Sequence, residues 1–186
     1  QLIIFDLLED YRYLVDISKS LSVKTVSFTD FSDFRDLRFI ISDIIINSYP
    51  INVNINSDDK SNIFSGLDYL VMSPEFKKIN KTKSIVSSSV ENVLITFGGS
   101  DFESKSSLKV IDAFEKLRYD LNINLVLGSA FEYSNELISK LKKSNKDYNI
   151  LYDVINMPKL ISESDLVISA AGNTMFEICC CGKPAI

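Results

Sequence analysis

Residues 164–186, SDLVISAAGNTMFEICCCGKPAI, constrain the fold more than any other part of this chain. They open with an apolar run, residues 165–169, that has the length and composition of a strand buried in a parallel sheet. Ala170, Ala171 and Gly172 follow, and three small residues allow the backbone to turn tightly. We therefore predict a buried strand that ends in a turn.

A helix is predicted directly after this turn. Thr174 and Glu177 have the spacing of a capping box, and a stop signal follows at Gly182 and Pro184. The start of such a helix presents unpaired backbone N–H groups and the positive end of a dipole, which is typical of an anion site. Two roles for Glu177 stay open: it returns a hydrogen bond to the helix start, or it faces a hydroxyl group of a ligand.

Composition excludes several classes of protein. The hydrophobic fraction of 46% and the charged fraction of 24% are those of an ordinary globular protein, and the net charge of -5 argues against a nucleic-acid partner. No apolar run is long enough to span a bilayer, and the first residues given do not show a basic stretch followed by an apolar one. We expect a cytoplasmic protein without a transmembrane segment.

The cysteine and histidine content limits the chemistry. The three cysteines are consecutive, Cys179 to Cys181, so on a helix they point in different directions, and the chain has no histidine. We predict no metal site and no cofactor, and we interpret the cysteines as small buried apolar residues. A base or nucleophile activated by histidine is excluded within this chain.

The first half predicts an incomplete α/β domain. Strands are expected at residues 2–6, 23–28 and 43–47, and residues 48–66 are expected to form a loop or irregular crossover. A helix is expected from about residue 10 to 21, with one apolar face formed by Tyr13, Leu14, Ile17 and Leu21. The Lys- and Ser-rich residues 77–89 read as a linker, so the domains are predicted as 1–80 and 81–186.

The second half alternates regularly between strands and helices, which predicts a doubly wound parallel sheet. Its first strand ends at Gly98 and Gly99, and Ser100 with Glu103 has the spacing of a second capping box. In a sheet of order 3-2-1-4-5 the first and fourth strands are neighbours, and ligands bind where the winding reverses between them. Two glycine turns at that point favour a pyrophosphate or nucleotide site, although neither turn is a dinucleotide fingerprint or a P-loop.

These segments resemble a known family. Residues 97–101 (FGGSD), residues 161–177 (ISESDLVISAAGNTMFE) and residues 181–186 (CGKPAI) are similar to the C-terminal domain of GT-B nucleotide-sugar enzymes. Within that group the chain looks most like the UDP-sugar hydrolase of pseudaminic acid biosynthesis and the spore-coat polysaccharide biosynthesis proteins. The resemblance implies two Rossmann-like domains of GT-B type, of which the N-terminal one is incomplete. It also implies that the chain is an internal fragment, truncated before the fifth strand of its C-terminal domain.

The resemblance further implies a set of substrate-binding residues. Those expected to contact the UDP phosphates are Gly98, Gly99, Ser100, Asp101, Gly172, Asn173 and Thr174. Glu177 is expected to hold the ribose hydroxyls. The catalytic residue is unknown, because the family's N-terminal G-x-G-H segment has no counterpart here.

The expected activity is hydrolysis of a UDP-sugar, releasing UDP from an acetamido-deoxy sugar in surface-glycan biosynthesis. The parent protein is expected to be the enzyme, and the fragment alone to be inactive. Two alternatives stay open: a GT-B glycosyltransferase that uses a UDP-sugar donor, and a non-catalytic module that binds nucleotide-sugars.

Overall fold

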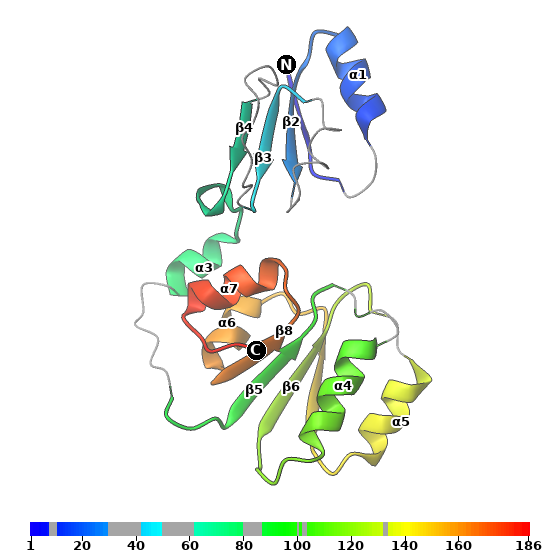
Figure 1. Ribbon diagram of the computed structural model, residues 1–186, viewed down its shortest axis with the longest axis vertical. Coiled ribbons are helices and arrows are strands. Elements are labelled where there is room, and N and C mark those ends of the chain that lie inside the picture. Colours follow the sequence, from blue (N-terminus) through cyan, green and yellow to red (C-terminus); the bar gives the residue numbers. More distant parts are fainter. Residues whose placement is uncertain are drawn as a thin grey trace. The chain divides into compact units, whose positions relative to one another are not determined.

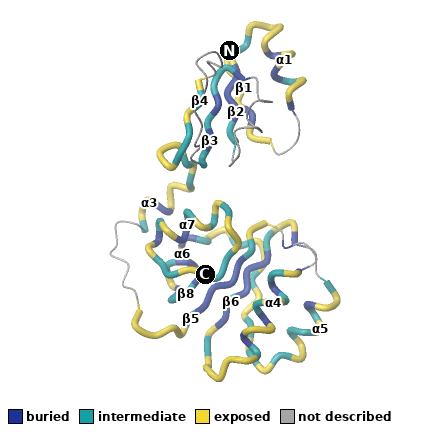
Figure 2. Tube along the Cα trace, viewed as in Figure 1, coloured by how far each residue is buried: buried dark blue, intermediate teal, exposed yellow. Residues whose placement is uncertain are grey.

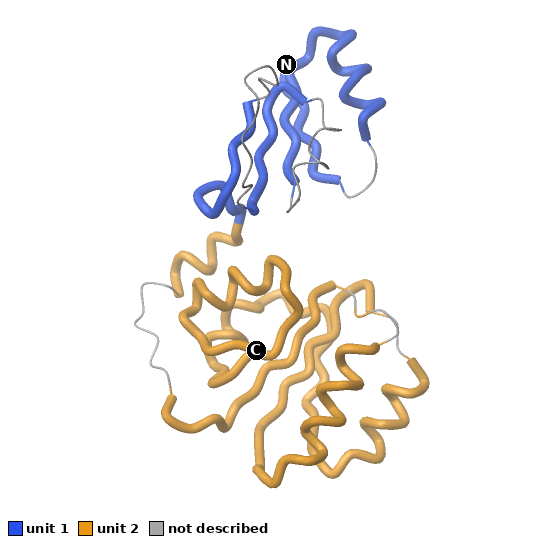
Figure 3. Tube along the Cα trace, viewed as in Figure 1, with its two compact units in different colours: residues 1–71 blue, residues 72–186 orange. Residues whose placement is uncertain are grey.

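The computed structural model shows two compact α/β units, residues 1–71 and residues 72–186 (Figure 3). It describes residues 1–7, 11–29, 42–49, 62–79, 87–99, 101, 104–131 and 134–186. The division between the units falls earlier than the boundary expected near residue 80.

Unit 1 is built on a parallel sheet with the strand order β1-β2-β3-β4 (Figure 1). Its elements are β1 (Leu2–Phe5), α1 (Arg12–Ser20), β2 (Lys24–Thr29), β3 (Ile44–Asn47), β4 (Asn62–Ser65) and the 3-10 helix η1 (Leu67–Tyr69). The last strand is a correction to the prediction of a loop over residues 48–66. β4 is short and half-exposed, so it lacks the apolar run by which a buried strand is found in a sequence.

Helix α1 buries a different face from the one predicted. Tyr13, Ile17 and Leu21 are exposed, by 62%, 53% and 69%, while Val15 and Ser18 are buried. Ser18 tolerates burial because its hydroxyl donates to the Leu14 carbonyl, at 2.8 Å. The buried residues of α1 also recur with the helical period. Periodicity alone therefore did not distinguish the face that is buried from the more apolar face that was predicted.

Asp43 ties β2 to the residue that precedes β3. Its carboxylate accepts hydrogen bonds from the Thr25 backbone N–H and the Thr25 hydroxyl, both at 2.9 Å, and from Lys24 Nζ at 3.1 Å. These hydrogen bonds lower the pKa of Asp43 from 3.8 to about 2. The bond from the Thr25 side chain has the largest effect, followed by the bond from the Thr25 backbone and then the bond from Lys24.

This lowered pKa predicts an acid-dependent loss of stability. Because the folded pKa lies below the unfolded one, the contribution of Asp43 is complete above about pH 4 and lost as the pH falls through about 2. The difference in unfolding free energy between wild type and Asp43→Asn, measured in urea, should therefore shrink across that interval. Asp16→Asn, on the exposed side of α1, is the control. A difference that is constant with pH would contradict the prediction.

Unit 2 contains the second parallel sheet, with the order β7-β6-β5-β8. Its elements are α3 (Pro74–Ile79), β5 (Asn92–Thr96), α4 (Lys105–Phe114), β6 (Asn122–Leu127), α5 (Asn135–Lys143), β7 (Tyr148–Tyr152), α6 (Met157–Glu163), β8 (Leu166–Ser169) and α7 (Asn173–Cys181). The predicted doubly wound order is confirmed, since β5 and β8, the first and fourth strands of this half, are neighbours. Both units are Rossmann-like.

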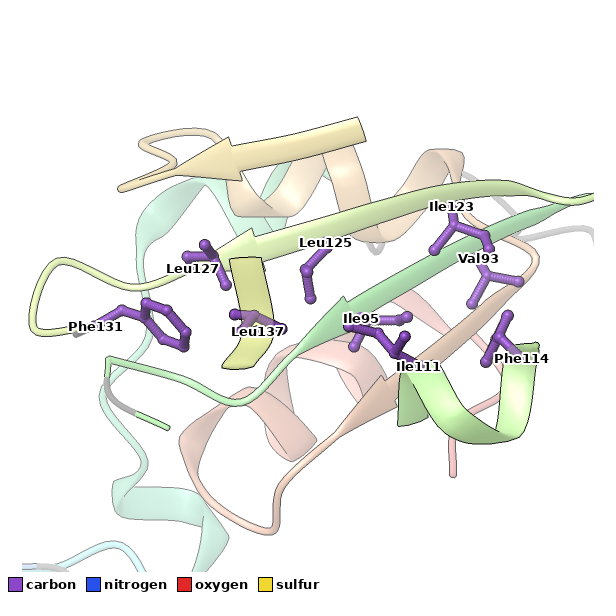
Figure 4. Packing of buried hydrophobic residues seen from close by; sticks show 9 residues of the cluster. All are labelled: Val93, Ile95, Ile111, Phe114, Ile123, Leu125, Leu127, Phe131 and Leu137. Atoms are coloured by element: carbon purple, nitrogen blue, oxygen red, sulfur yellow. The ribbon is translucent and has the colours of Figure 1, made fainter. Parts of the chain in front are cut away.

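The two faces of the second sheet are covered by different helices. Side chains alternate along each strand, so Val93 and Ile95 pack with α4 and α5 in one core cluster, shown in Figure 4, whereas Leu94 packs with α3, α6 and α7 in another. The central strands are consequently buried on both faces (Figure 2). This explains the apolar run of residues 93–95 in β5.

Helix α3 belongs to this unit, although its sequence was assigned partly to the first domain and partly to the linker. Phe76 is only 2% exposed and lies in the core cluster with Val167 and Ile178. Ser73 and Pro74 are a helix start signal, because proline is favoured in the first turn of a helix. The linker was predicted without this signal. The remaining residues of the predicted linker are described only from residue 87 onward.

The chain extends the sheet beyond β8 at its last residues. Val167 forms a parallel bridge with Ala185, and the Val167 N–H donates to the Pro184 carbonyl at 3.0 Å. Gly182 ends α7 in the left-handed region, with φ of 64°, as its stop signal predicted. The helix therefore returns the chain to the edge of the sheet.

Candidate functional site

Strands β5 and β8 bring the two glycine turns to the same edge of the sheet. They pair in parallel with Thr96 opposite Ser169, and each strand ends at that residue. The turn of residues 97–99 and the turn of residues 170–172 therefore begin at the same level on adjacent strands. This is the carboxyl edge, where open α/β sheets bind ligands.

Asp165 fixes this register from the opposite end of the strands. Its carboxylate accepts hydrogen bonds from the backbone N–H groups of Asn92, at 2.8 Å, and Glu91, at 3.0 Å. These bonds lower its pKa, the Asn92 bond most of all. The start of β8 is thereby tied to the start of β5, so the turns at their far ends are held at one level.

The first turn is open toward solvent. Gly98 has φ of 78°, a conformation that favours glycine, and both Gly98 and Gly99 are exposed. Within the described part of the chain, a Cβ atom on either residue would meet nothing within 4 Å. Space for a ligand therefore lies directly over the backbone. Ser100 and Glu103, which formed the predicted second capping box, lie outside the described residues.

Asp101 binds the start of α4 instead of facing open space. It is 8% exposed, and its two carboxylate oxygens accept hydrogen bonds from the backbone N–H groups of Ser106, at 3.0 Å, and Ser107, at 2.8 Å. A carboxylate at a helix start is favoured by the helix dipole. The side chain of Asp101 thus fills the place that an anion would take at α4.

The start of α7 is different. The residue preceding its first turn is Gly172, in an extended conformation with φ of 177°, and no side chain in the described part of the chain caps this helix start. The predicted capping box of Thr174 and Glu177 is wrong, because Thr174 is already inside the helix and Glu177 lies beyond its first turn. The first backbone N–H groups and the dipole of α7 are therefore available to an anionic ligand at the β5–β8 edge.

Glu177 is a half-buried carboxylate without a hydrogen-bond partner among the described residues. Burial raises its pKa above the ordinary value of 4.5. Partial burial of an unpaired carboxylate costs free energy, and groups perturbed in this way concentrate at functional sites. With the capping box excluded, a ligand hydroxyl is the remaining role of the two considered for Glu177.

The cysteines are only partly buried, in contrast to the prediction. Cys181 is buried, and burial raises its pKa to about 11, whereas Cys179 is exposed. Cys180 is partly buried, and its Sγ lies 3.8 Å from the Phe76 carbonyl oxygen.

Nowhere in the described residues do three or more His, Cys, Asp or Glu side chains gather as metal ligands. None of the described helices is both long and apolar enough to cross a bilayer.

The sequence reading missed Gly128, the residue directly after β6. Its Cα lies against the first glycine turn, since a Cβ built on it would be 2.4 Å from the carbonyl oxygens of Gly98 and Gly99. The signal was present, because residues 123–128 repeat the pattern of an apolar strand followed by glycine.

Residues 92–186, which contain this whole site, match the model of the glycosyltransferase family 28 C-terminal domain. The chain belongs to this family. This match, together with the similar proteins described next, confirms the prediction that the chain belongs to the GT-B nucleotide-sugar enzymes.

The relatives are longer than this family 28 chain. It is 37% identical over 135 residues to the uncharacterized protein MJ1062 of Methanocaldococcus jannaschii, covering 70% of this chain and 28% of that protein. It is 25% identical over 190 residues to the spore coat polysaccharide biosynthesis protein SpsG of Bacillus subtilis, covering 100% of this chain and 54% of that protein. MurG of Acinetobacter baumannii shares its fold, with a TM-score of 0.55 at 17% identity over 90% of this chain and 46% of that chain. The chain thus spans about half or less of the proteins that it matches.

Proposed function

We propose that this chain binds the UDP part of a nucleotide-sugar at the carboxyl edge of the unit 2 sheet. The observation that carries the proposal is the pairing of β5 with β8, which sets the open glycine turn beside the uncapped start of α7. The backbone of Gly98, Gly99, Gly172, Asn173 and Thr174 contacts the diphosphate. Ser100 belongs to the same set by its place in the sequence.

The other two site residues have separate roles in this proposal. Asp101 holds the start of α4 and so fixes the end of the first turn, rather than contacting phosphate through a carboxylate of like charge. Glu177 accepts hydrogen bonds from the ribose hydroxyls, which supplies the partner that its carboxylate lacks among the described residues. A carboxylate acceptor makes stronger hydrogen bonds than a neutral one.

The reaction we propose for the whole enzyme is cytoplasmic hydrolysis of a UDP-sugar in surface-glycan biosynthesis, with an acetamido-deoxy sugar as the product besides UDP. When the bond between sugar and diphosphate breaks, negative charge accumulates on the departing UDP. The N–H groups and dipole at the start of α7 stabilise that charge. This chain contains no histidine, so it supplies leaving-group stabilisation but no histidine base.

Transfer of the sugar to an acceptor is the second candidate, and the match to a glycosyltransferase family favours it. Both reactions use the same nucleotide site and release UDP. UDP release from a UDP-sugar, measured with and without candidate acceptors, separates them. Release that requires an acceptor identifies a transferase, and release in water alone identifies a hydrolase.

The nucleotide site itself is tested by comparing UDP with uridine. If the two turns bind the diphosphate, most of the affinity comes from the phosphates, so UDP should bind at least about tenfold more tightly than uridine in calorimetry. UMP, which has one phosphate, should lie between them. Equal affinities for UDP and uridine would refute the proposed diphosphate site.

A further inference from the structure

The loop of residues 128–131 lies directly against the first glycine turn. No Cβ could be accommodated at Gly128, because it would stand 2.4 Å from two carbonyl oxygens of that turn. The Ala130 backbone N–H also donates a hydrogen bond to the Gly99 carbonyl, at 3.1 Å. The turn is therefore held from the side of β6 by one close backbone approach and one hydrogen bond.

This loop is anchored at both of its ends. Phe131 is buried in the core beside Leu127 and Leu137 (Figure 4), and its N–H donates to the Gly128 carbonyl at 3.1 Å. Leu127, the last residue of β6, accepts a hydrogen bond from the Asp153 N–H at 3.0 Å. Anchors of this kind make the loop a rigid base for the residues that it contacts.

Tyr152 adds a third attachment from the next strand. It is the last residue of β7, and its hydroxyl donates to the Ser129 carbonyl at 2.9 Å. The contacts therefore run across the carboxyl edge in the order of the strands, from Tyr152 through Ser129 and Ala130 to Gly99. Tyr152 is 52% exposed, so it is not a core residue.

The glycine turn needs such support because it is open on its other side. No atom of the described residues lies within 4 Å of where a Cβ on Gly98 or Gly99 would stand, and Gly98 adopts a left-handed conformation. Glycine is the residue with the most conformational freedom, so holding its N–H groups in one arrangement requires contacts from neighbouring segments. Preorganised groups bind a charged ligand more tightly than mobile ones.

We infer that residues 128–131 and Tyr152 form a support that sets the conformation of the phosphate-binding turn, with Gly128 and Tyr152 as positioning residues that do not touch the ligand. The inference rests on the proposed nucleotide site. It predicts an effect on binding of the diphosphate that is separate from binding of the nucleoside, because the support meets the proposed site at the first glycine turn.

Two variants test the support, each with a matched control. Tyr152→Phe removes one hydroxyl from an exposed residue. Its control, Tyr119→Phe, makes the same change at a residue that is 70% exposed and lies outside the support. Gly128→Ala pushes against the turn, whereas Ser129→Ala changes the neighbouring exposed side chain and keeps the carbonyl that Tyr152 binds. Affinities for UDP and for uridine are measured in parallel by calorimetry, with thermal unfolding of the free protein.

UDP affinity should fall about three- to fivefold in Tyr152→Phe, as expected for one neutral hydrogen bond, and more than about tenfold in Gly128→Ala. Uridine affinity should stay unchanged in both, and both controls should bind like the wild type. If Gly128→Ala fails to fold, Tyr152→Phe decides alone. Unchanged UDP affinity, or a parallel loss of uridine affinity, overturns the support while the proposed function stands. A wild-type protein that binds UDP no better than uridine overturns both.

Discussion

Glu177→Gln is expected to weaken UDP binding roughly tenfold to a hundredfold while the free energy of unfolding changes by less than about 1 kcal/mol. The amide keeps the shape of the carboxylate but replaces charge-assisted hydrogen bonds to the ribose hydroxyls with weaker ones. Stability should hardly suffer, because Glu177 has no hydrogen-bond partner in the described protein that the substitution could remove. Calorimetry with UDP and urea unfolding of the same samples measure both quantities.

The pH dependence of stability gives this prediction a second, independent measurement. Burial raises the folded pKa of Glu177 above its ordinary value of 4.5, so the folded state holds its proton more tightly than the unfolded state. The contribution of this group to stability therefore declines as the pH rises from about 4.5 through the raised pKa. In Glu177→Gln that decline should be absent, and the variant should be at least as stable as the wild type at neutral pH.

The matched control is Glu163→Gln at the end of α6, an exposed carboxylate 3.8 Å from Lys159 Nζ. A surface pair of this kind contributes little to stability, so UDP affinity and stability should both stay close to wild type. Unchanged UDP affinity in Glu177→Gln would remove the ribose role. A loss of affinity accompanied by an equal loss of stability would point to a structural role.

Phe76→Ala is expected to reduce the free energy of unfolding of unit 2 by about 3 to 5 kcal/mol, the usual cost of deleting a buried aromatic ring. Phe76 is 2% exposed and packs in the cluster that also contains Val167 and Ile178. Its loss leaves a cavity among α3, α6 and α7. Since α7 carries the candidate anion site, UDP affinity should also fall.

Val71→Ala is the control for this substitution, because Val71 is 71% exposed and is the last residue of unit 1. It should change stability by less than about 0.5 kcal/mol. Hydrogen exchange locates the effect: amides of α6 and α7 should exchange faster in Phe76→Ala, and those of β2 and β3 should not. Wild-type exchange in α6 and α7 would mean that α3 does not stabilise the core of unit 2.

Local patterns predicted the elements that form the candidate site. Apolar runs located β5 and β8, and glycine turns with a helix stop signal located α7, because both kinds of signal lie within a few residues of sequence. The alternation of strands and helices then predicted a doubly wound parallel sheet with β5 beside β8, since right-handed crossovers leave few other arrangements.

Tertiary structure decided which helix face is buried, which residue caps a helix and which residue contacts the first glycine turn. Periodicity allowed two buried faces for α1, and packing selected the one that contains Ser18. Spacing allowed a capping box at Thr174, but the turn after β8 places Gly172 at the N-cap of α7 and leaves Glu177 without a hydrogen-bond partner among the described residues. The close approach of Gly128 to the first glycine turn depends on the pairing of β5 with β6, a contact between residues about thirty positions apart. Sequence by itself determined the strands β5 and β8, helix α7 and their order, because these follow from short-range propensities. Burial, capping and support follow from contacts that exist only once the chain has folded.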